Sequence, residues 1–281
     1  MILIADSGST KTDWVLISPR TKKEYRTTGI NPYFMSKSEI VQILTRTFDT
    51  KQRKQIHSVF FYGAGCASPV RKEVVVNAIL ESFPEATVEI DTDLKGTARA
   101  LFGKNPGIAC ILGTGSNCGF YDGKDITFKY ASLGYVLGDE GSGSSMGKQM
   151  IRDYLYEDLP TDLRGPFSQF MDNASRDRIM EQVYKSPFPN RFLASVVPFI
   201  KKNEMHPFVE NLVFENFNAF FTKHVMKYPD IHVKSIGFCG TVSVLFSTLL
   251  HKVAYSNRLT ISNIIASPME GLIEYHKNNV E

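Results

Sequence analysis

Two segments of the chain share one pattern, in which a short polar turn separates two apolar runs. They are residues 1–17, with the turn Asp-Ser-Gly-Ser-Thr, and residues 108–121, with the turn Gly-Thr-Gly-Ser-Asn. An apolar run of this length bounded by glycine is typical of a buried strand, and two of them around a short turn predict a β-hairpin. Turns of glycine, serine and threonine expose backbone N–H groups and hydroxyls that suit phosphate. Two such hairpins predict a duplicated fold with two phosphate loops facing one cleft.

The remaining segments alternate between strand-like and helix-like patterns. Apolar periodicity predicts helices over residues 36–48, 70–83, 95–102, 146–157, most of 162–228, 241–255 and 268–276. Short β-rich runs predict strands over residues 24–28, 58–62, 87–90, 232–238 and 259–266. Ser36 precedes Glu39 by three residues, the spacing of a capping box at a helix start. The alternation predicts an α/β protein with helices packed on mixed sheets, and the Asn-Pro-Gly turn at 105–107 is the expected boundary between two halves.

Composition narrows the class of partner. The chain has 281 residues, 43% of them hydrophobic and 22% charged, which is normal for a globular protein. A net charge of +3 is too small to indicate a nucleic-acid partner, and the basic patches at 20–23 and 51–54 are expected to be solvated turns. No apolar stretch approaches a membrane span, so we expect a cytoplasmic protein with no membrane partner. The four cysteines show no CxxC pair, which predicts free thiols.

Asp6 ends the first apolar run, where a carboxylate costs desolvation free energy unless it is paired or faces a cleft. Beside a phosphate turn its natural partner is Mg²⁺, which accepts one or two carboxylates and keeps several waters. The alternative is a plain turn-forming aspartate, since Asp-Ser-Gly is a common turn sequence. The second phosphate turn favours the metal.

Other nucleotide motifs are missing from the sequence. Residues 143–149 have the wrong spacing for a P-loop and end in glutamine, and the Gly-Ala-Gly at 63–65 lacks the third glycine of a dinucleotide fingerprint. Neither an HExxH motif nor the kinase HRD and DFG pair occurs. A nucleotide would therefore be held by some other kind of loop.

Acidic residues supply the candidate chemistry. Asp93 follows a β-rich run and precedes a helix, a position that suits a general base accepting a hydroxyl proton, or equally a helix N-cap. Asp91 lies two residues earlier and is expected to be a decoy. Asp139 and Glu140 adjoin in a glycine-rich loop, where they suit a sugar hydroxyl or a metal, or else a capped helix entrance.

The glycines at 237 and 240 end one strand and open a helix without side-chain bulk. Close approach of the backbone to a flat ring such as adenine would explain them. A tight turn between strand and helix would explain them nearly as well.

Together these motifs resemble the sugar kinase, Hsp70 and actin superfamily. Asp6-Ser-Gly-Ser-Thr resembles its first phosphate motif, Gly113-Thr-Gly-Ser-Asn its second and Gly237-Phe-Cys-Gly-Thr its adenosine motif. Thr92-Asp-Leu-Lys-Gly and Gly138-Asp-Glu-Gly-Ser are similar to the N-acetylglucosamine kinase branch, grouped with the BadF/BadG/BcrA/BcrD ATPases. The resemblance implies two ribonuclease H-like (actin-like ATPase) domains, 1–106 and 107–267, with mixed sheets and an interdomain cleft, and a terminal helix, 268–281, that rejoins the first domain.

The same resemblance implies an ATP-dependent kinase of an amino sugar, N-acetylglucosamine first among them, acting on the 6-hydroxyl. Asp93 would be the catalytic base, Asp6 would organise Mg²⁺, and Asn31, Asp93, Asp139 and Glu140 would bind the sugar. The residues implied to hold the ATP phosphates are Gly8, Ser9, Thr10, Lys11, Thr12, Gly113, Thr114, Gly115 and Ser116. Gly240 and Thr241 would lie against adenosine.

Two departures from the family pattern concern the acyl pocket. Leu133 stands where the family often has tryptophan, and Tyr33 stands where some relatives have it. Glucosamine and N-acetylmuramate therefore remain alternative substrates. An ATPase that activates an iron–sulfur dehydratase or reductase is an alternative of a different class, and the sequence leaves the oligomeric state open, a homodimer included.

Overall fold

The computed structural model describes residues 1–8 and 10–277, and they form two compact units. Unit 1 consists of Met1–Asn105, Gly123–Ile126 and the segment that begins at Pro268. Unit 2 consists of Pro106–Asp122 and Thr127–Ser267.

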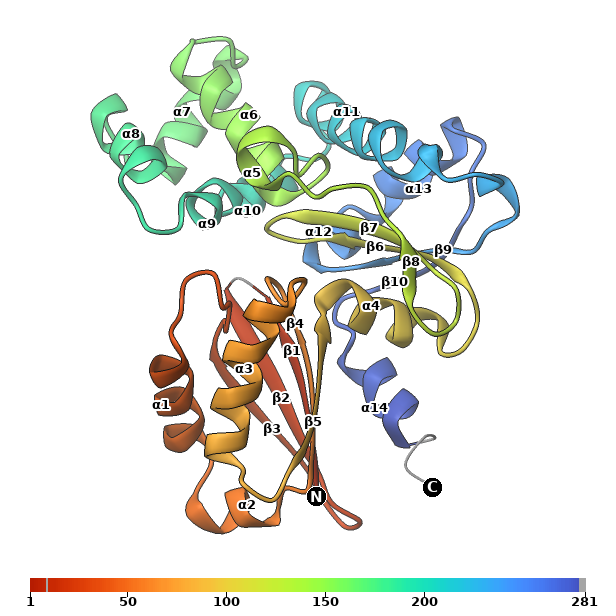
Figure 1. Ribbon diagram of the computed structural model, residues 1–281. Coiled ribbons are helices and arrows are strands. Elements are labelled where there is room, and N and C mark those ends of the chain that lie inside the picture. The colour runs from red at the N-terminus through yellow and green to blue at the C-terminus, as the bar shows by residue number, and fades with distance from the viewer. Residues whose placement is uncertain (9, 278–281) are drawn as a thin grey trace. The chain divides into compact units, whose positions relative to one another are not determined.

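The sheet of unit 1 has the order β3-β2-β1-β4-β5 (Figure 1). Its strands are β1 (Ile2–Ser7), β2 (Lys11–Ile17), β3 (Lys22–Thr28), β4 (Ser58–Gly63) and β5 (Thr87–Thr92). The first three are antiparallel neighbours, whereas β4 runs parallel to both β1 and β5. Because β1, β4 and β5 run in one direction, their carboxyl ends meet at one edge of the sheet, where ligands of α/β proteins bind.

Helices cover both faces of this sheet. They are α1 (Lys37–Thr47), α2 (Thr50–Gln55), α3 (Pro69–Ser82), α4 (Asp93–Phe102) and α14 (Met269–Lys277). Side chains alternate between the faces of a strand, so Leu3 and Ala5 pack in one core with α1 and α3, while Ile4 packs in a second core with Leu272 and Ile273 of α14. The apolar runs of the strands are long because both faces are buried.

Two helix starts in unit 1 show how local sequence sets the boundaries. Ser36 and Glu39 form the predicted capping box at the start of α1. The expectation of a solvated turn at 51–54 is wrong, because these residues belong to α2, whose own capping box joins Asp49 and Gln52.

The second sheet repeats the plan of the first. In the order β8-β7-β6-β9-β10 it contains β6 (Gly107–Leu112), β7 (Ser116–Tyr121), β8 (Ile126–Phe128), β9 (Ile236–Cys239) and β10 (Ile261–Ile265). β6 is antiparallel to β7 and parallel to β9, as β1 is to β2 and β4. Strand order and direction thus confirm the predicted duplicated α/β fold with mixed sheets.

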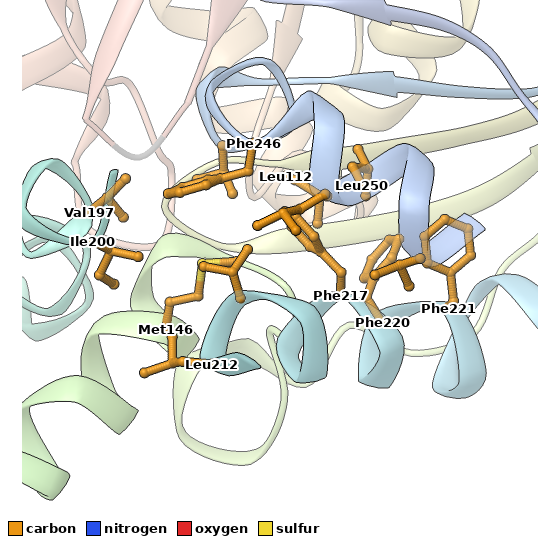
Figure 2. Close-up of a cluster of buried hydrophobic side chains, with 14 of the residues drawn as sticks. Leu112, Met146, Val197, Ile200, Leu212, Phe217, Phe220, Phe221, Phe246 and Leu250 are labelled. Carbon is orange, nitrogen blue, oxygen red and sulfur yellow. The ribbon is translucent and has the colours of Figure 1, made fainter. Parts of the chain in front are cut away.

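Unit 2 carries a larger set of helices than unit 1. They are α5 (Gly134–Leu137), α6 (Gly143–Leu155), α7 (Thr161–Phe170), α8 (Arg176–Tyr184), α9 (Pro189–Ala194), α10 (Val197–Lys202), α11 (Pro207–Lys223), α12 (Thr241–Leu245) and α13 (Ser247–Ser256). Phe217, Phe220 and Phe221 of α11 fill the core together with Phe246 and Leu250 (Figure 2). The strand predicted at 232–238 is shorter, because Ile231–Val233 forms a 3₁₀ turn before β9 begins at Ile236.

The sequence predicted that the chain has no membrane span and that its cysteines are free thiols. In the described part of the chain, no helix is both long and apolar enough to cross a membrane. The four cysteines, Cys66, Cys110, Cys118 and Cys239, are free and buried.

Candidate active site

The first phosphate turn joins β1 to β2. The backbone N–H of Gly8 donates to the carbonyl oxygen of Lys11 at 3.0 Å, which closes the turn. The ammonium of Lys11 is paired with Asp13 at 2.5 Å, and Thr10 is exposed. Ser9, implied to bind phosphate, lies outside the described residues.

Two buried hydroxyls beside this turn fix the loop that carries Asn31. The hydroxyl oxygens of Ser7 and Thr12 lie 2.7 Å apart, and both accept a hydrogen bond from the backbone N–H of Ile30, at 3.0 and 3.1 Å. Ser7 also donates to the carbonyl oxygen of Ile30 at 2.9 Å. The family resemblance implies that Thr12 holds phosphate. In the structure its hydroxyl instead supports the loop that follows β3.

Asn31 itself begins a tight loop in unit 1. Its side-chain oxygen accepts a hydrogen bond from the backbone N–H of Tyr33 at 2.9 Å, so the side-chain NH₂ is the group left to donate to a ligand. Gly65 lies against this loop, and a Cβ atom there would be 2.3 Å from the side-chain oxygen of Asn31. Gly65 also has a φ of +85°, which glycine adopts readily. The glycine at 65 is thus explained by close approach of the Asn31 loop.

Asp93 is the first residue of α4, directly after β5. Thr92 caps the helix, since its hydroxyl accepts a hydrogen bond from the backbone N–H of Lys95 at 3.2 Å. The N-cap alternative for Asp93 is therefore wrong. A carboxylate in the first turn of a helix lies in the favourable field of the helix dipole, and Asp93 is partly exposed.

Asp91 has the structural role expected of a decoy. It forms ion pairs with Lys72 at 3.3 Å and Lys95 at 2.9 Å. Burial alone would raise its pKa, but hydrogen bonds from Lys95 and from the backbone of Thr92 hold the pKa of Asp91 below its ordinary value. Asp91 is thus a paired anion.

Asp6 differs from Asp91 in having no hydrogen bond to its side chain from any described residue. Burial, the charge of Asp93 and the charge of Asp13 together raise the pKa of Asp6 to about 7, against the smaller opposing effect of Lys11. The interaction with Asp93 shows that two carboxyl groups lie close enough at this edge to feel each other's charge. Two carboxyl groups that raise each other's pKa favour binding of a divalent metal.

The second phosphate turn, between β6 and β7, is docked on the start of α6. The backbone N–H groups of Gly143 and Ser144 donate to the carbonyl oxygens of Gly113 and Thr114, at 2.9 and 3.0 Å. The turn is also closed internally by a 3.0 Å hydrogen bond from Gly113 to Gly115. The carbonyl groups of Gly113, Thr114 and Gly115 are therefore occupied by the protein, and the N–H groups of Thr114 and Gly115 are the ones that these hydrogen bonds leave for a ligand.

Asp139 lies on this turn. Its carboxylate accepts a hydrogen bond from the backbone N–H of Ser116 at 3.3 Å, and a Cβ atom at Gly115 would be 2.8 Å from its second oxygen. Burial and the neighbouring charge of Glu140 raise the pKa of Asp139, although the Ser116 hydrogen bond works against them. A carboxylate thus occupies a place at which the turn would offer an N–H group to a phosphate.

Glu140 points to a different set of partners. It forms ion pairs with Lys223 at 2.9 Å and with His224 at 3.0 Å, both at the end of α11. Burial would raise its pKa, yet the hydrogen bonds from these two residues lower the pKa of Glu140 to about 2. The two adjacent acids therefore have different partners. Asp139 contacts the second phosphate turn, whereas Glu140 pairs with residues at the end of α11.

Gly240 lies between β9 and α12, with a φ of +125°. A Cβ atom there would be 2.3 Å from the carbonyl oxygen of Leu112. The close contact with the end of β6 explains this glycine structurally, and it brings the β9–α12 turn next to the second phosphate turn. Thr241 follows as the first residue of α12 and is exposed.

The structure is similar to that of the putative N-acetylglucosamine kinase from Porphyromonas gingivalis. The two chains are 39% identical, the match covers 99% of each, and the TM-score is 0.94. The chain belongs to the N-acetylglucosamine kinase family.

More distant structures extend the family's fold. A second kinase of the same description, from Chromobacterium violaceum, is 16% identical with a TM-score of 0.71 over 98% of each chain. The ROK family glucokinase of Streptomyces griseus, solved with glucose and AMPPNP, is 11% identical with a TM-score of 0.53 over 99% of this chain and 98% of that one. These similarities show that the family shares its α/β fold with sugar kinases of other branches.

A relative found by sequence similarity supports the same family over a shorter stretch of the chain. The N-acetylmuramic acid/N-acetylglucosamine kinase of Clostridium acetobutylicum is 28% identical over 97 residues, which span 33% of this chain and 32% of that protein. The match thus covers about a third of the curated relative. No protein-family model matches the chain.

The sequence pattern did not indicate the structural roles of three residues in this family member. Ser7 holds the Asn31 loop, Tyr62 of β4 packs against Gly96 of α4, and Arg71 of α3 lies over Tyr33. Each acts through contacts between segments far apart in the chain. The signal that the sequence does contain is glycine at positions 65 and 96, where the absence of a side chain lets Tyr33 and Tyr62 approach closely.

Proposed function

We propose that the protein is an ATP-dependent kinase that phosphorylates the 6-hydroxyl of an amino sugar, with N-acetylglucosamine as the first candidate. The observation that carries this proposal is the acid pair of unit 1. Asp93 stands at the start of α4, and its charge raises the pKa of the unpartnered Asp6. Family membership supports the same class of reaction.

In this proposal Asp93 acts as the general base. The 6-oxygen of the sugar attacks the γ-phosphorus of ATP, the bond from that phosphorus to the β–γ bridging oxygen breaks, and the hydroxyl proton passes to Asp93. Asp91 cannot substitute for it, because Lys72 and Lys95 already occupy its carboxylate. The NH₂ group of Asn31, left open by the internal hydrogen bond of its loop, would orient the sugar.

The turn at Gly113–Ser116, through the backbone N–H groups of Thr114 and Gly115, and the turn at Gly8 would hold the ATP phosphates. The β9–α12 turn at Gly240 and Thr241 would lie against the adenosine. The first of these loops is well suited, because the start of α6 holds its carbonyl groups. Asp139 would leave the Ser116 N–H when phosphate arrives.

Asp6 fits the role of a Mg²⁺ ligand. Among the described residues no three acidic, histidine or cysteine side chains gather into a metal-binding cluster, so the ion would take its other ligands from phosphate and water. When bound, Mg²⁺ would neutralise charge on the phosphates. Burial and the charge of Asp93 raise the pKa of Asp6 more than the charge of Lys11 lowers it, so a bound cation would stabilise this carboxylate.

The iron–sulfur activator is not favoured by the structure. Such a protein needs cysteine side chains at its surface to hold a shared cluster, whereas all four cysteines here are buried.

An assay of ADP release across a panel of amino sugars and hexoses tests the proposal. We expect ADP release above the sugar-free background with N-acetylglucosamine, and weaker release with glucose. Release no faster than background with every sugar would overturn the proposed function.

A further inference from the structure

Arg71 lies in the first turn of α3 with its guanidinium flat over the ring of Tyr33. The guanidinium carbon is 3.3 Å from the ring centroid, and one NH₂ group donates to the carbonyl oxygen of Pro32 at 3.0 Å. These contacts fix the plane of the guanidinium. Within the described part of the chain, no carboxylate pairs with Arg71.

The neighbouring cations behave differently. Lys72, the next residue of α3, pairs with Asp91. Lys37 of α1 pairs with Glu81, which lies on α3. Arg71 therefore stands out as an oriented cation whose remaining N–H groups have no acidic partner among the described residues.

Arg71 is held by the loop that carries the proposed sugar ligand. Tyr33 donates its backbone N–H to the side chain of Asn31, and Gly65 allows both residues to approach. Tyr33 is 57% exposed and Phe34 is 66% exposed, so the loop keeps an open aromatic surface beside the cation. A planar guanidinium held in this way matches the two oxygens of a carboxylate.

We propose that Arg71, stacked on Tyr33 beside Asn31, binds the carboxylate of an acidic amino sugar and so sets the substrate class of the site. The inference rests on the proposed function, because it places the sugar at Asn31. N-acetylmuramate is the probe, since its lactyl ether adds one carboxylate to the frame of N-acetylglucosamine. Because the two sugars differ by the lactyl group, comparing them measures the contribution of the carboxylate that Arg71 would bind.

The test is the ratio of kcat/KM for N-acetylmuramate to kcat/KM for N-acetylglucosamine in wild type, Arg71→Gln and Arg71→Lys. A hydrogen bond to a charged group contributes about 1.5–3 kcal/mol, so Arg71→Gln should lower the ratio about ten- to hundredfold. Arg71→Lys keeps the charge but loses the planar fork, and should fall between. Thermal unfolding of each variant verifies folding.

Calorimetric titration with N-acetylmuramate gives a measure that is independent of turnover. We expect binding by wild type that weakens with rising salt concentration and is lost or much reduced in Arg71→Gln. Absence of binding by wild type would overturn the inference, whereas ADP release with N-acetylglucosamine would still support the proposed kinase.

Other outcomes would also contradict the role of Arg71. An equal loss with both sugars would show that it only supports the Asn31 loop. A higher KM for ATP with both sugars would place it on the nucleotide. If Arg71→Gln is unstable, the test rests on Arg71→Lys and on the salt dependence of N-acetylmuramate binding by wild type. An unchanged ratio of kcat/KM values in Arg71→Lys, together with binding that does not depend on salt, overturns the inference.

Discussion

The carboxylate of Asp139 accepts a hydrogen bond from the backbone N–H of Ser116 at 3.3 Å. This contact joins the Gly-Asp-Glu-Gly-Ser segment to the Gly-Thr-Gly-Ser turn, two motifs that are separate in the sequence. The hydrogen bonds from Gly143 and Ser144 to the same turn strengthen the connection. The two motifs therefore act as one structural unit, in which one segment shapes the phosphate turn formed by the other.

Replacement of Asp139 tests this connection. In Asp139→Ala the backbone N–H of Ser116 loses its acceptor and becomes open to phosphate, so we expect KM for ATP to fall by up to about tenfold with little change in KM for the sugar. Asp139→Asn is the matched control, because its side-chain oxygen can still accept that hydrogen bond, and its KM for ATP should change less. Steady-state kinetics with each substrate varied would check this. A rise confined to KM for the sugar would instead favour the sugar-binding role that the family resemblance implies.

Asp93→Asn should lower kcat by about 10²- to 10⁴-fold, the usual contribution of a general base, and leave ATP affinity nearly unchanged. Asp91→Asn is the control at the end of the same strand. It should lose far less activity, because the carboxylate of Asp91 is engaged by the ion pairs with Lys72 and Lys95 and by the backbone N–H of Thr92. Equal activity of Asp93→Asn and wild type would refute the base assignment.

Asp6→Asn should increase the Mg²⁺ concentration needed for half-maximal activity by about tenfold or more, since an amide is a poorer ligand for Mg²⁺ than a carboxylate. Asp13→Asn provides a comparison on the adjacent strand, because Asp13 is already paired with Lys11 and Arg26. Titration of activity with Mg²⁺ at fixed ATP measures both variants. The metal role would be wrong if the Mg²⁺ requirement of Asp6→Asn matched that of wild type.

His276 predicts how stability depends on pH. It is buried against Phe60, bonded to the hydroxyl of Tyr62 at 2.8 Å, and burial lowers the pKa of His276 from 6.5 to about 4. The charge of Arg99 acts in the same direction. Between these pKa values the unfolded chain binds a proton that the folded chain does not, so the free energy of unfolding should fall as pH drops from 6.5 toward 4, by up to about 3 kcal/mol.

Urea unfolding at pH 7, 6 and 5 would measure this effect, with His276→Phe as the control. Phenylalanine keeps the stacking on Phe60 and removes the titrating group, so the variant should show a shallower loss of stability. The same slope in both proteins would assign the pH dependence to other groups.

Local sequence carries enough information for most of the fold. The strands of both hairpins were predictable because their apolar runs are buried on both faces, and Ser36 and Glu39 mark the start of α1 by their spacing alone. α2 escaped prediction because it is short and polar, and its capping box at Asp49 lies within a basic stretch. At 231–233 an apolar pattern forms a 3₁₀ turn, which shows that periodicity does not fix the start of a short strand.

The candidate site was only partly predictable for a related reason. Asp6, Asp93 and the two phosphate turns stand at ends of strands, so their positions follow from the fold. The support of Asn31 by Ser7 and Thr12, and the position of Arg71 over Tyr33, depend on contacts between distant segments that a sequence pattern does not record. Asp139 and Glu140 are adjacent in sequence and yet have different partners, because the positive φ of Asp139, 58°, turns the chain between them.

The most direct test of the central claim is ³¹P NMR of the product formed from ATP and N-acetylglucosamine. We predict a phosphate monoester on the 6-oxygen of the sugar, formed together with ADP by the wild-type protein and not by Asp93→Asn. ADP and inorganic phosphate without a sugar ester, or no consumption of ATP, would contradict the assignment of the protein as an amino sugar kinase.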